Sequence, residues 1–405
     1  MIGPEDRRSE RVAAVRLAVV LLAGIVAALN IGKLPPALPA LQQSFGMSLV
    51  QASFLVSVFQ VAGMSLGLFS GVLADRFGPR FVMAIGLGIL AVASAAGALA
   101  TAPGALLATR ALESAGFILA VLPGPALLRR VLAFDRMSMA LGYWGSYMPT
   151  GTAIGLAATP WLMGAGGWQL AWWLASLAAV ATLVLVVRVL PQDPPQHAVQ
   201  VRVFALARDT VRVPGPWLLA GCFGLYAGQF IAVFGFLPTA YQSAGIAATT
   251  AGVLTAVGVA VNMIGNVASG SLLQRGASRT LLLAGTSLVM AVCAVPAFAA
   301  EVPFAIRYAA VLVFSAVGGL IPGTLFTTAP RFSPYPGAVS TTTGLMQQGS
   351  TIGQFIAPPL AAAVASAVGG WHRTWWVLSA FALANVAVAF FIGRLDRRVE
   401  ARLRG

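Results

Sequence analysis

The sequence predicts an all-α membrane protein with twelve transmembrane helices, arranged as two parallel six-helix repeats. Hydrophobic residues make up 59% of the 405 residues and charged residues only 9%, whereas about 25% of a soluble domain is charged. The apolar residues form twelve runs, and about 20 such residues cross a bilayer as a helix. Finally, segments of the second half repeat segments of the first half in order.

The runs follow one another along the chain with short connections. The first run follows a basic segment at residues 7–16 and lacks a small-residue cleavage site after it, so we expect an uncleaved span and not a signal peptide. The runs are too long and continuous for barrel strands. The predicted spans are 14–35, 48–70, 80–100, 104–128, 138–161, 168–190, 215–240, 249–272, 280–299, 303–327, 338–366 and 372–393.

Arginine placement predicts the orientation of these spans. Basic residues occupy alternate loops, and the opposite loops hold little charge beyond Glu301, His372 and Arg373. Because basic loops face the cytoplasm, both termini are expected there, in a bacterial-type inner membrane. The polar stretch 191–214 is expected to be a cytoplasmic linker with a short surface helix. It would join an N-terminal half at 1–190 to a C-terminal half at 215–405.

The composition also excludes several classes of protein. The formal net charge is +14, but the arginines lie between apolar runs and form no groove-reading motif, so no nucleic-acid partner is expected. Lys33 is the only lysine. Cys222 and Cys293 do not have the spacing of a metal site. Without an HExxH or Walker motif, we expect no enzyme, no metal and no cofactor.

The repeat supports the division into halves. An offset of 199 residues places SGVLADRFGPR from Ser70 on SGSLLQRGASR from Ser269. An offset of 198 places GTAIGLAATP from Gly151 on GSTIGQFIAP from Gly349. Ordered matches at nearly one offset are strong evidence of duplication. Because each half has an even number of spans, the two copies are expected to share one orientation in the membrane.

The loop after the second span carries a family signature. It contains Gly71, Asp75, Arg76, Gly78 and Arg80, and it resembles the loop motif of the major facilitator superfamily in sequence and position. That resemblance covers essentially the whole chain. It implies a gating loop in which the carboxylate accepts hydrogen bonds from arginines or from a helix N-terminus. The alternative is a plain basic turn.

Two further stretches resemble parts of this family. Arg110 and Gly116 in the fourth span resemble the arginine-then-glycine pattern associated with proton coupling. The fifth span departs from the Gly-Pro-x-x-Gly-Gly motif of drug/proton antiporters, because Pro149 lacks a preceding glycine. That span and the Trp-x-x-x-Trp-Trp pattern at 168–173 are similar to the cyanate-permease-like branch.

Charged residues inside the spans are the strongest site candidates. A charge at the centre of a span costs about 2.5–3.5 kcal/mol on insertion scales. Lys33, Arg110, Glu113 and Arg307 are in this class, and the family resemblance implies that their spans line the transport path. Glu113 is the predicted proton-coupling residue. The alternatives are a static Arg110–Glu113 ion pair and, for Lys33 and Arg307, side chains that reach the membrane interface.

Polar residues complete the predicted substrate-binding set. Three cations against one carboxylate favour a small anionic solute, moved by a monomer that couples its transport to protons across the lipid bilayer. The alternatives are proton-driven efflux of amphipathic drugs or metabolites, and a non-transporting membrane sensor. For each uncharged residue, an interhelical hydrogen bond is the other interpretation. The predicted set is Asn30, Lys33, Arg110, Tyr143, Tyr147, Gln229, Asn262, Arg307 and Gln347.

Overall fold

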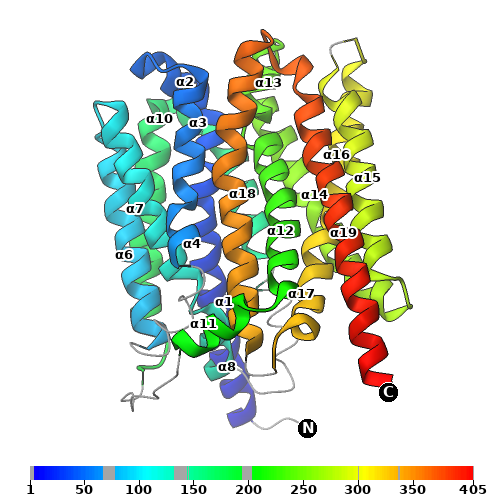
Figure 1. Ribbon diagram of the computed structural model, residues 1–405. Coiled ribbons are helices and arrows are strands. Elements are labelled where there is room, and N and C mark those ends of the chain that lie inside the picture. The colour runs from blue at the N-terminus through cyan, green and yellow to red at the C-terminus, as the bar shows by residue number, and fades with distance from the viewer. Residues whose placement is uncertain are drawn as a thin grey trace. The chain divides into compact units, whose positions relative to one another are not determined.

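The computed structural model describes residues 4–66, 78–131, 144, 146–193, 203–299, 301–335 and 338–404, and every regular element within these ranges is a helix (Figure 1). The chain forms two compact units. Unit 1 contains Met1–Phe45 and Ser70–Val201, and unit 2 contains Gly46–Phe69 and Arg202–Gly405. Helices overlap all twelve predicted spans, which confirms the predicted fold class.

Unit 1 contains the long helices of the N-terminal part. The longest, α10, covers two predicted spans. Gly166 and Gly167 lie between those spans and interrupt the helix with non-helical backbone angles. Gly167 has a φ of 71°, which glycine adopts at little cost. In Figure 1, α6 lies beside α7. The helices are α1 (Pro4–Gly32), α2 (Leu34–Phe45), α6 (Pro79–Ala98), α7 (Pro103–Val121), α8 (Gly124–Val131) and α10 (Tyr147–Val189).

Unit 2 contains the second predicted span together with the C-terminal spans. That second span forms the α3–α4 segment, which packs along α18, and the Gln348 side chain donates a 2.6 Å hydrogen bond to the Met64 carbonyl oxygen. The predicted halves therefore differ from these contact units by one span and stay a prediction. The helices are α3 (Leu49–Ser57), η1 (Val58–Gln60), α4 (Val61–Leu66), α11 (Val203–Val211), α12 (Pro214–Phe234), α13 (Leu237–Ser243), α14 (Ala248–Gln274), α15 (Arg279–Phe298), α16 (Phe304–Gly318), α17 (Leu320–Phe332), α18 (Val339–Ala367), η4 (Trp371–Arg373) and α19 (Trp375–Arg404).

Nine helices of the described residues are long and apolar enough to cross a membrane. A tenth candidate, Leu49–Ser65, is shorter. One of the nine is α10, which combines two predicted spans. The short helix α11 lies in the stretch for which the sequence predicted a surface helix.

Glycines bring equivalent helix pairs together in the two units. In unit 1, a Cβ on Gly151 of α10 would lie 2.2 Å from a backbone oxygen of α1. In unit 2, a Cβ on Gly349 of α18 would lie 2.4 Å from a backbone oxygen of α12, and one on Gly353 would lie 2.0 Å from the Gly224 oxygen. Such close backbone approach is typical of small residues between membrane helices. The repeat in sequence is therefore also a repeat in packing.

We expect Gly353→Ala to destabilise the protein by about 1–3 kcal/mol, because the new methyl group overpacks the contact between α18 and α12. The matched control is Gly221→Ala on α12, where an added Cβ meets nothing within 4 Å. That change should leave stability equal or raise it, because alanine favours a helix by about 1 kcal/mol over glycine. Thermal unfolding of the two purified variants measures the difference, and equal melting temperatures would contradict the packing argument.

Candidate functional site

The site in unit 1 begins at Lys33, where α1 meets α2. The two residues Pro35 and Pro36 have no backbone N–H to donate to the last carbonyls of α1, so the chain bends here. The helical path continues nevertheless, since the Lys33 N–H donates to the Leu29 oxygen at 2.9 Å. Gly155 on α10 leaves room for this bend, since a Cβ there would lie 2.8 Å from the Lys33 backbone nitrogen.

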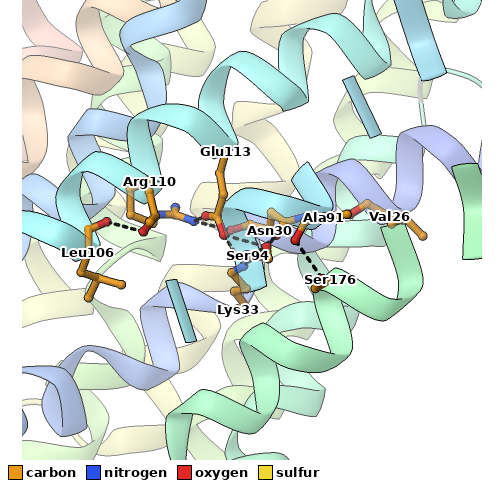
Figure 2. Close-up of polar contacts among 10 residues, drawn as sticks. Val26, Asn30, Lys33, Ala91, Ser94, Leu106, Arg110, Glu113 and Ser176 are labelled. Atoms are coloured by element: carbon orange, nitrogen blue, oxygen red, sulfur yellow. Dashed lines mark hydrogen bonds and ion pairs between the residues drawn. The ribbon is translucent and has the colours of Figure 1, made fainter. Parts of the chain in front are cut away.

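The Glu113 carboxylate lies between two cations. Its Oε1 accepts a hydrogen bond from Lys33 Nζ at 2.6 Å, and its Oε2 accepts one from an Arg110 nitrogen at 2.5 Å. Arg110 and Glu113 share one face of α7 because they are three residues apart. Figure 2 shows Lys33 and Arg110 converging on this carboxylate. We call Lys33, Arg110 and Glu113 the charge cluster.

The charge cluster is buried. Lys33 and Arg110 are each 1% exposed, and Glu113 is 0% exposed. The interpretation of Lys33 as a side chain that reaches the interface is therefore wrong, because its ammonium group is enclosed within unit 1. Two positive charges and one negative charge give the cluster a net charge of +1 when all three groups are ionised.

Polar groups from neighbouring helices complete the hydrogen bonds of the charge cluster. Lys33 Nζ also donates to Asn30 Oδ1 at 2.7 Å and to Ser94 Oγ at 2.8 Å. The Ser94 hydroxyl lies 2.7 Å from Glu113 Oε1 and 2.9 Å from Asn30 Oδ1. Arg110 donates to the Asn30 backbone oxygen at 2.9 Å. The three N–H groups of the ammonium thus have three acceptors, which is the full complement for a lysine.

Trp172 of α10 covers the cluster. The Lys33 Nζ lies 4.7 Å from the centre of its indole ring, within the range of a cation–π interaction. The Trp172 side chain is 0% exposed, and its ring N–H has no partner among the described residues. Gly97 of α6 accommodates the ring, since a Cβ there would lie 2.7 Å from it.

Close contact between α6 and α7 positions Ser94 against Glu113. A Cβ on Gly86 of α6 would lie 2.3 Å from a backbone nitrogen of α7, and a Cβ on Gly116 of α7 would lie 2.8 Å from one of α6. Larger side chains at these glycines would separate the two helices. The serine hydroxyl would then lose its hydrogen bond to the carboxylate.

Of the predicted binding residues, the structure brings together Asn30, Lys33 and Arg110, with the predicted coupling residue Glu113 among them. Tyr147 packs in the apolar core of unit 1, with its ring 4.6 Å from the Trp144 ring. Tyr143 lies outside the described residues.

The other four predicted binding residues belong to unit 2. Gln229 donates to the Leu378 oxygen at 2.8 Å, an interhelical bond between α12 and α19. The Asn262 amide donates to the Tyr226 hydroxyl at 2.9 Å. Arg307 is half-buried in the first turn of α16, where its Nε has no partner among the described residues. The Gln347 side chain is exposed on α18.

The predicted gating loop is described only at its end. Gly71, Asp75 and Arg76 lie outside the described residues. Gly78 precedes α6 and has a φ of 88°, which glycine adopts at little cost. A Cβ on Gly78 would lie 2.4 Å from the Asp193 carboxylate, so the glycine also leaves room for that side chain.

Asp193 forms a clamp that the sequence did not predict. Its carboxylate accepts hydrogen bonds from the backbone N–H groups of Arg80, at 3.2 Å, and Phe81, at 2.9 Å, so it caps α6. It also pairs with Arg130 at 2.6 Å, and the Arg80 side chain donates to the Val187 oxygen.

A second clamp joins three helices of unit 2. There, Asp396 of α19 pairs with Arg331 at 2.9 Å and with Arg279 at 3.4 Å. The two aspartates are separated by 203 residues (396 − 193), the offset between Gly166 and Gly369 in the glycine-tryptophan repeat. That repeat was the signal through which the sequence could have revealed both clamps.

A helical membrane fold that encloses charged side chains is typical of membrane transporters. The sequence profile of the Major Facilitator Superfamily matches residues 20–348. The chain therefore belongs to the Major Facilitator Superfamily and is a multi-pass membrane protein. The cyanate-permease-like branch stays a prediction.

Several curated relatives are resistance proteins. Puromycin resistance protein pur8 of Streptomyces alboniger is 32% identical over 228 residues, which are 56% of this chain and 42% of that protein. The methylenomycin A resistance protein of Streptomyces coelicolor is 27% identical over 41% of this chain and 35% of that protein. The tetracenomycin C resistance and export protein of Streptomyces glaucescens is 28% identical over 36% and 27%. The chain thus spans less than half the length of these relatives.

Solved transporter structures share the fold. A bacterial homologue of the human lysosomal transporter Spinster, in an inward-facing and unoccupied conformation, has a TM-score of 0.80 at 15% identity, over 96% of this chain and 98% of that one. A mutant of the nucleoside transporter NupG has a TM-score of 0.78 at 12% identity, over 93% and 99%. At these identities the similarity concerns the fold alone.

We expect Asp193→Ala to destabilise the protein by about 1–2 kcal/mol, because two backbone N–H groups of α6 lose their cap and Arg130 loses its partner. Asp193→Asn retains an acceptor oxygen and should cost less. Asp209→Ala is the matched control, since the partners of Asp209 among the described residues, Arg208 and Tyr335, are exposed and surface changes stay within about 0.5 kcal/mol. Thermal unfolding of the three variants measures this order, and an equal effect of Asp193→Ala and Asp209→Ala would refute the clamp.

Proposed function

We propose that the protein is a proton-driven exporter of an amphipathic organic compound, with the charge cluster as its coupling site. The observation that carries the proposal is a carboxylate, Glu113, held out of water between Lys33 and Arg110. Ionisable groups inside a membrane protein are expensive, and they commonly mark ion pathways.

The geometry of the charge cluster suits coupling. Its partners come from α1, α6, α7 and α10. A movement of any one of these helices would separate at least one pair of interacting groups. Loss of a buried ionic partner costs about 3–5 kcal/mol, so the protonation state of the cluster and the arrangement of the helices must influence each other.

The solute class is proposed from two considerations. Both cations of the cluster are bonded to Glu113, so neither is presented to a solute as an open anion site. Three relatives are named for resistance to puromycin, methylenomycin A and tetracenomycin C, which are organic compounds. Export of an amphipathic compound therefore agrees better with the cluster than uptake of an inorganic anion.

A small organic or inorganic anion is the second candidate solute. The net charge of +1 of the charge cluster and the half-buried Arg307 of unit 2 favour it. An anion that bound the cluster would displace Glu113 from one of its two cations. Affinity for an anion should then fall with Arg110→Lys, because the planar guanidinium binds carboxylates through two hydrogen bonds and an ammonium does not.

The arginine-rich loops are proposed to face the cytoplasm, which would place both termini there, in a bacterial-type inner membrane. The protein is proposed to act as a monomer. The loop with Asp75, together with Arg80 and the Asp193 clamp, is proposed to control the change between the open states of the transporter.

A cysteine at position 202 tests the proposed orientation. If the arginine-rich loops face the cytoplasm, this cysteine should not react with an impermeant reagent added to intact cells, and a reaction there would place these loops outside the cell.

Transport assays in proteoliposomes should separate the two solute classes. We expect lipophilic organic cations and neutral amphipathic compounds to move against their gradients when a pH gradient is imposed. Small carboxylates and inorganic anions should not compete with them. The control is the same assay with a protonophore, which should abolish accumulation. Stronger transport of small anions would favour the second candidate and overturn the first.

Glu113→Gln tests the coupling site. The change removes the charge with little change in shape, so we expect solute exchange to continue while accumulation driven by a pH gradient is lost. Expression and thermal stability are measured alongside. If the cluster is only a static ion pair, uncompensated cations would lower stability by about 3–5 kcal/mol and exchange would fall with it. Intact gradient-driven accumulation in this variant would refute the proposed coupling site.

A further inference from the structure

We propose that Lys33, and not Glu113, is the group that releases and rebinds the proton within the charge cluster. This inference rests on the proposed function, since it assigns the proton to one member of the proposed coupling site. Three observations carry it: the net charge of the cluster, the hydrogen-bonding capacity of its neighbours, and the burial of all three charged groups.

The net charge decides which group titrates. With all groups ionised, the buried cluster carries +1. Protonation of Glu113 would raise this to +2 in surroundings that penalise net charge. Deprotonation of Lys33 would instead bring the cluster to zero, with the Arg110–Glu113 ion pair intact. Arg110 is excluded as the carrier because a guanidinium does not lose its proton in proteins. Only loss of the Lys33 proton leaves a neutral, paired site.

The neighbours can satisfy Lys33 in both protonation states. As an ammonium, Nζ donates to Asn30, Ser94 and Glu113. As an amine, it has two N–H groups and one lone pair. It could donate to Asn30 and Glu113 and accept a hydrogen bond from the Ser94 hydroxyl, which now has Glu113 Oε1 and Asn30 Oδ1 within reach. Rotation of one hydroxyl group thus accommodates the change without leaving a buried polar group unpaired.

Opposing interactions act on the two protonation states of Lys33, and Trp172 contributes one of them. Its ring lies 4.7 Å from Nζ and attracts the ammonium, as Glu113 does. Burial and the nearby Arg110 charge act in the opposite direction. These are the charged, titratable and aromatic groups that the structure places against Lys33 from α7 and α10, and Asn30 and Ser94 are its polar neighbours from α1 and α6. A proton carrier needs this balance, because strong preference for either state would prevent release or rebinding.

The step itself is a single proton transfer. One Nζ–H bond of the ammonium breaks, its electron pair stays on nitrogen as the lone pair of the amine, and the proton passes to water as the cluster closes. Hydration of the cluster favours the charged ammonium, and exclusion of water favours the neutral amine. Opening of the cluster to water would therefore take up a proton, and closing would release it.

The single lysine makes a direct measurement possible. Protein labelled with ¹³C at lysine Cε should give one side-chain resonance, assigned by its loss in Lys33→Arg. The reference is Arg275→Lys, which adds a lysine at an exposed position. As the pH is raised, we expect the Lys33 signal to move to the amine position while the reference lysine remains an ammonium. A Lys33 signal that follows the reference across the pH range would overturn the inference.

Transport by Lys33→Arg provides the second test. Arginine retains the positive charge but cannot release a proton, so this variant should lose accumulation driven by a pH gradient while Glu113 is still present. If Glu113 carried the proton, Lys33→Arg should still accumulate solute. Should the larger side chain prevent folding, the resonance of the unmodified protein still decides the question.

The outcomes distinguish this inference from the proposed function. Gradient-driven transport by the unmodified protein with a Lys33 signal that remains an ammonium refutes the lysine as carrier and leaves the function standing. Absence of any pH-gradient effect on transport by the unmodified protein refutes the proposed function, whatever the resonance shows. Support requires both gradient-driven transport and a Lys33 signal at the amine position.

Discussion

The arrangement of unit 1 depends on the requirement that a carboxylate removed from water must have partners. Glu113 satisfies it with Lys33, Arg110 and Ser94, which come from three separate helical segments. Those segments must approach closely, and glycines at the α6–α7 and α1–α10 contacts permit the approach. The polar cluster thus depends on the small-residue contacts, because a serine hydroxyl on α6 can reach a carboxylate on α7 only if the two helix backbones approach closely.

The two repeats share their packing but not their charges. Glycines of α10 and α18 occupy corresponding positions, and both units place an aspartate near the end of their last long helix between arginines. At the 199-residue offset, however, Glu113 corresponds to Leu312 and Arg110 to Ala309. Duplication therefore gave both copies the same packing, whereas among the described residues the buried charged side chains belong to one copy. An asymmetric distribution of this kind allows one unit to respond to protons while the other need not.

Much of the fold could be predicted from the sequence, because membrane spans are set by the length of apolar runs. Lys33 shows where this reasoning fails. The predicted first span ended at residue 35, which placed Lys33 near the end of a membrane helix and suggested that its side chain could reach the interface. In the structure α2 continues to Phe45, and Lys33 is buried. Ser94 and Trp172 could not have been predicted as neighbours of Glu113, since one serine or tryptophan in an apolar helix has no periodic signal. Their role depends on contacts between helices distant in sequence.

The enclosed lysine has a practical consequence for chemical work on this protein. Every other basic side chain in these 405 residues is an arginine or a histidine. Amine-directed cross-linkers, biotinylation reagents and fluorescent esters therefore have no exposed lysine to attack while unit 1 stays folded, and labelling through lysine would report unfolding. A lysine-specific endoproteinase likewise has one cleavage position, after Lys33, and it becomes available only when the charge cluster has come apart.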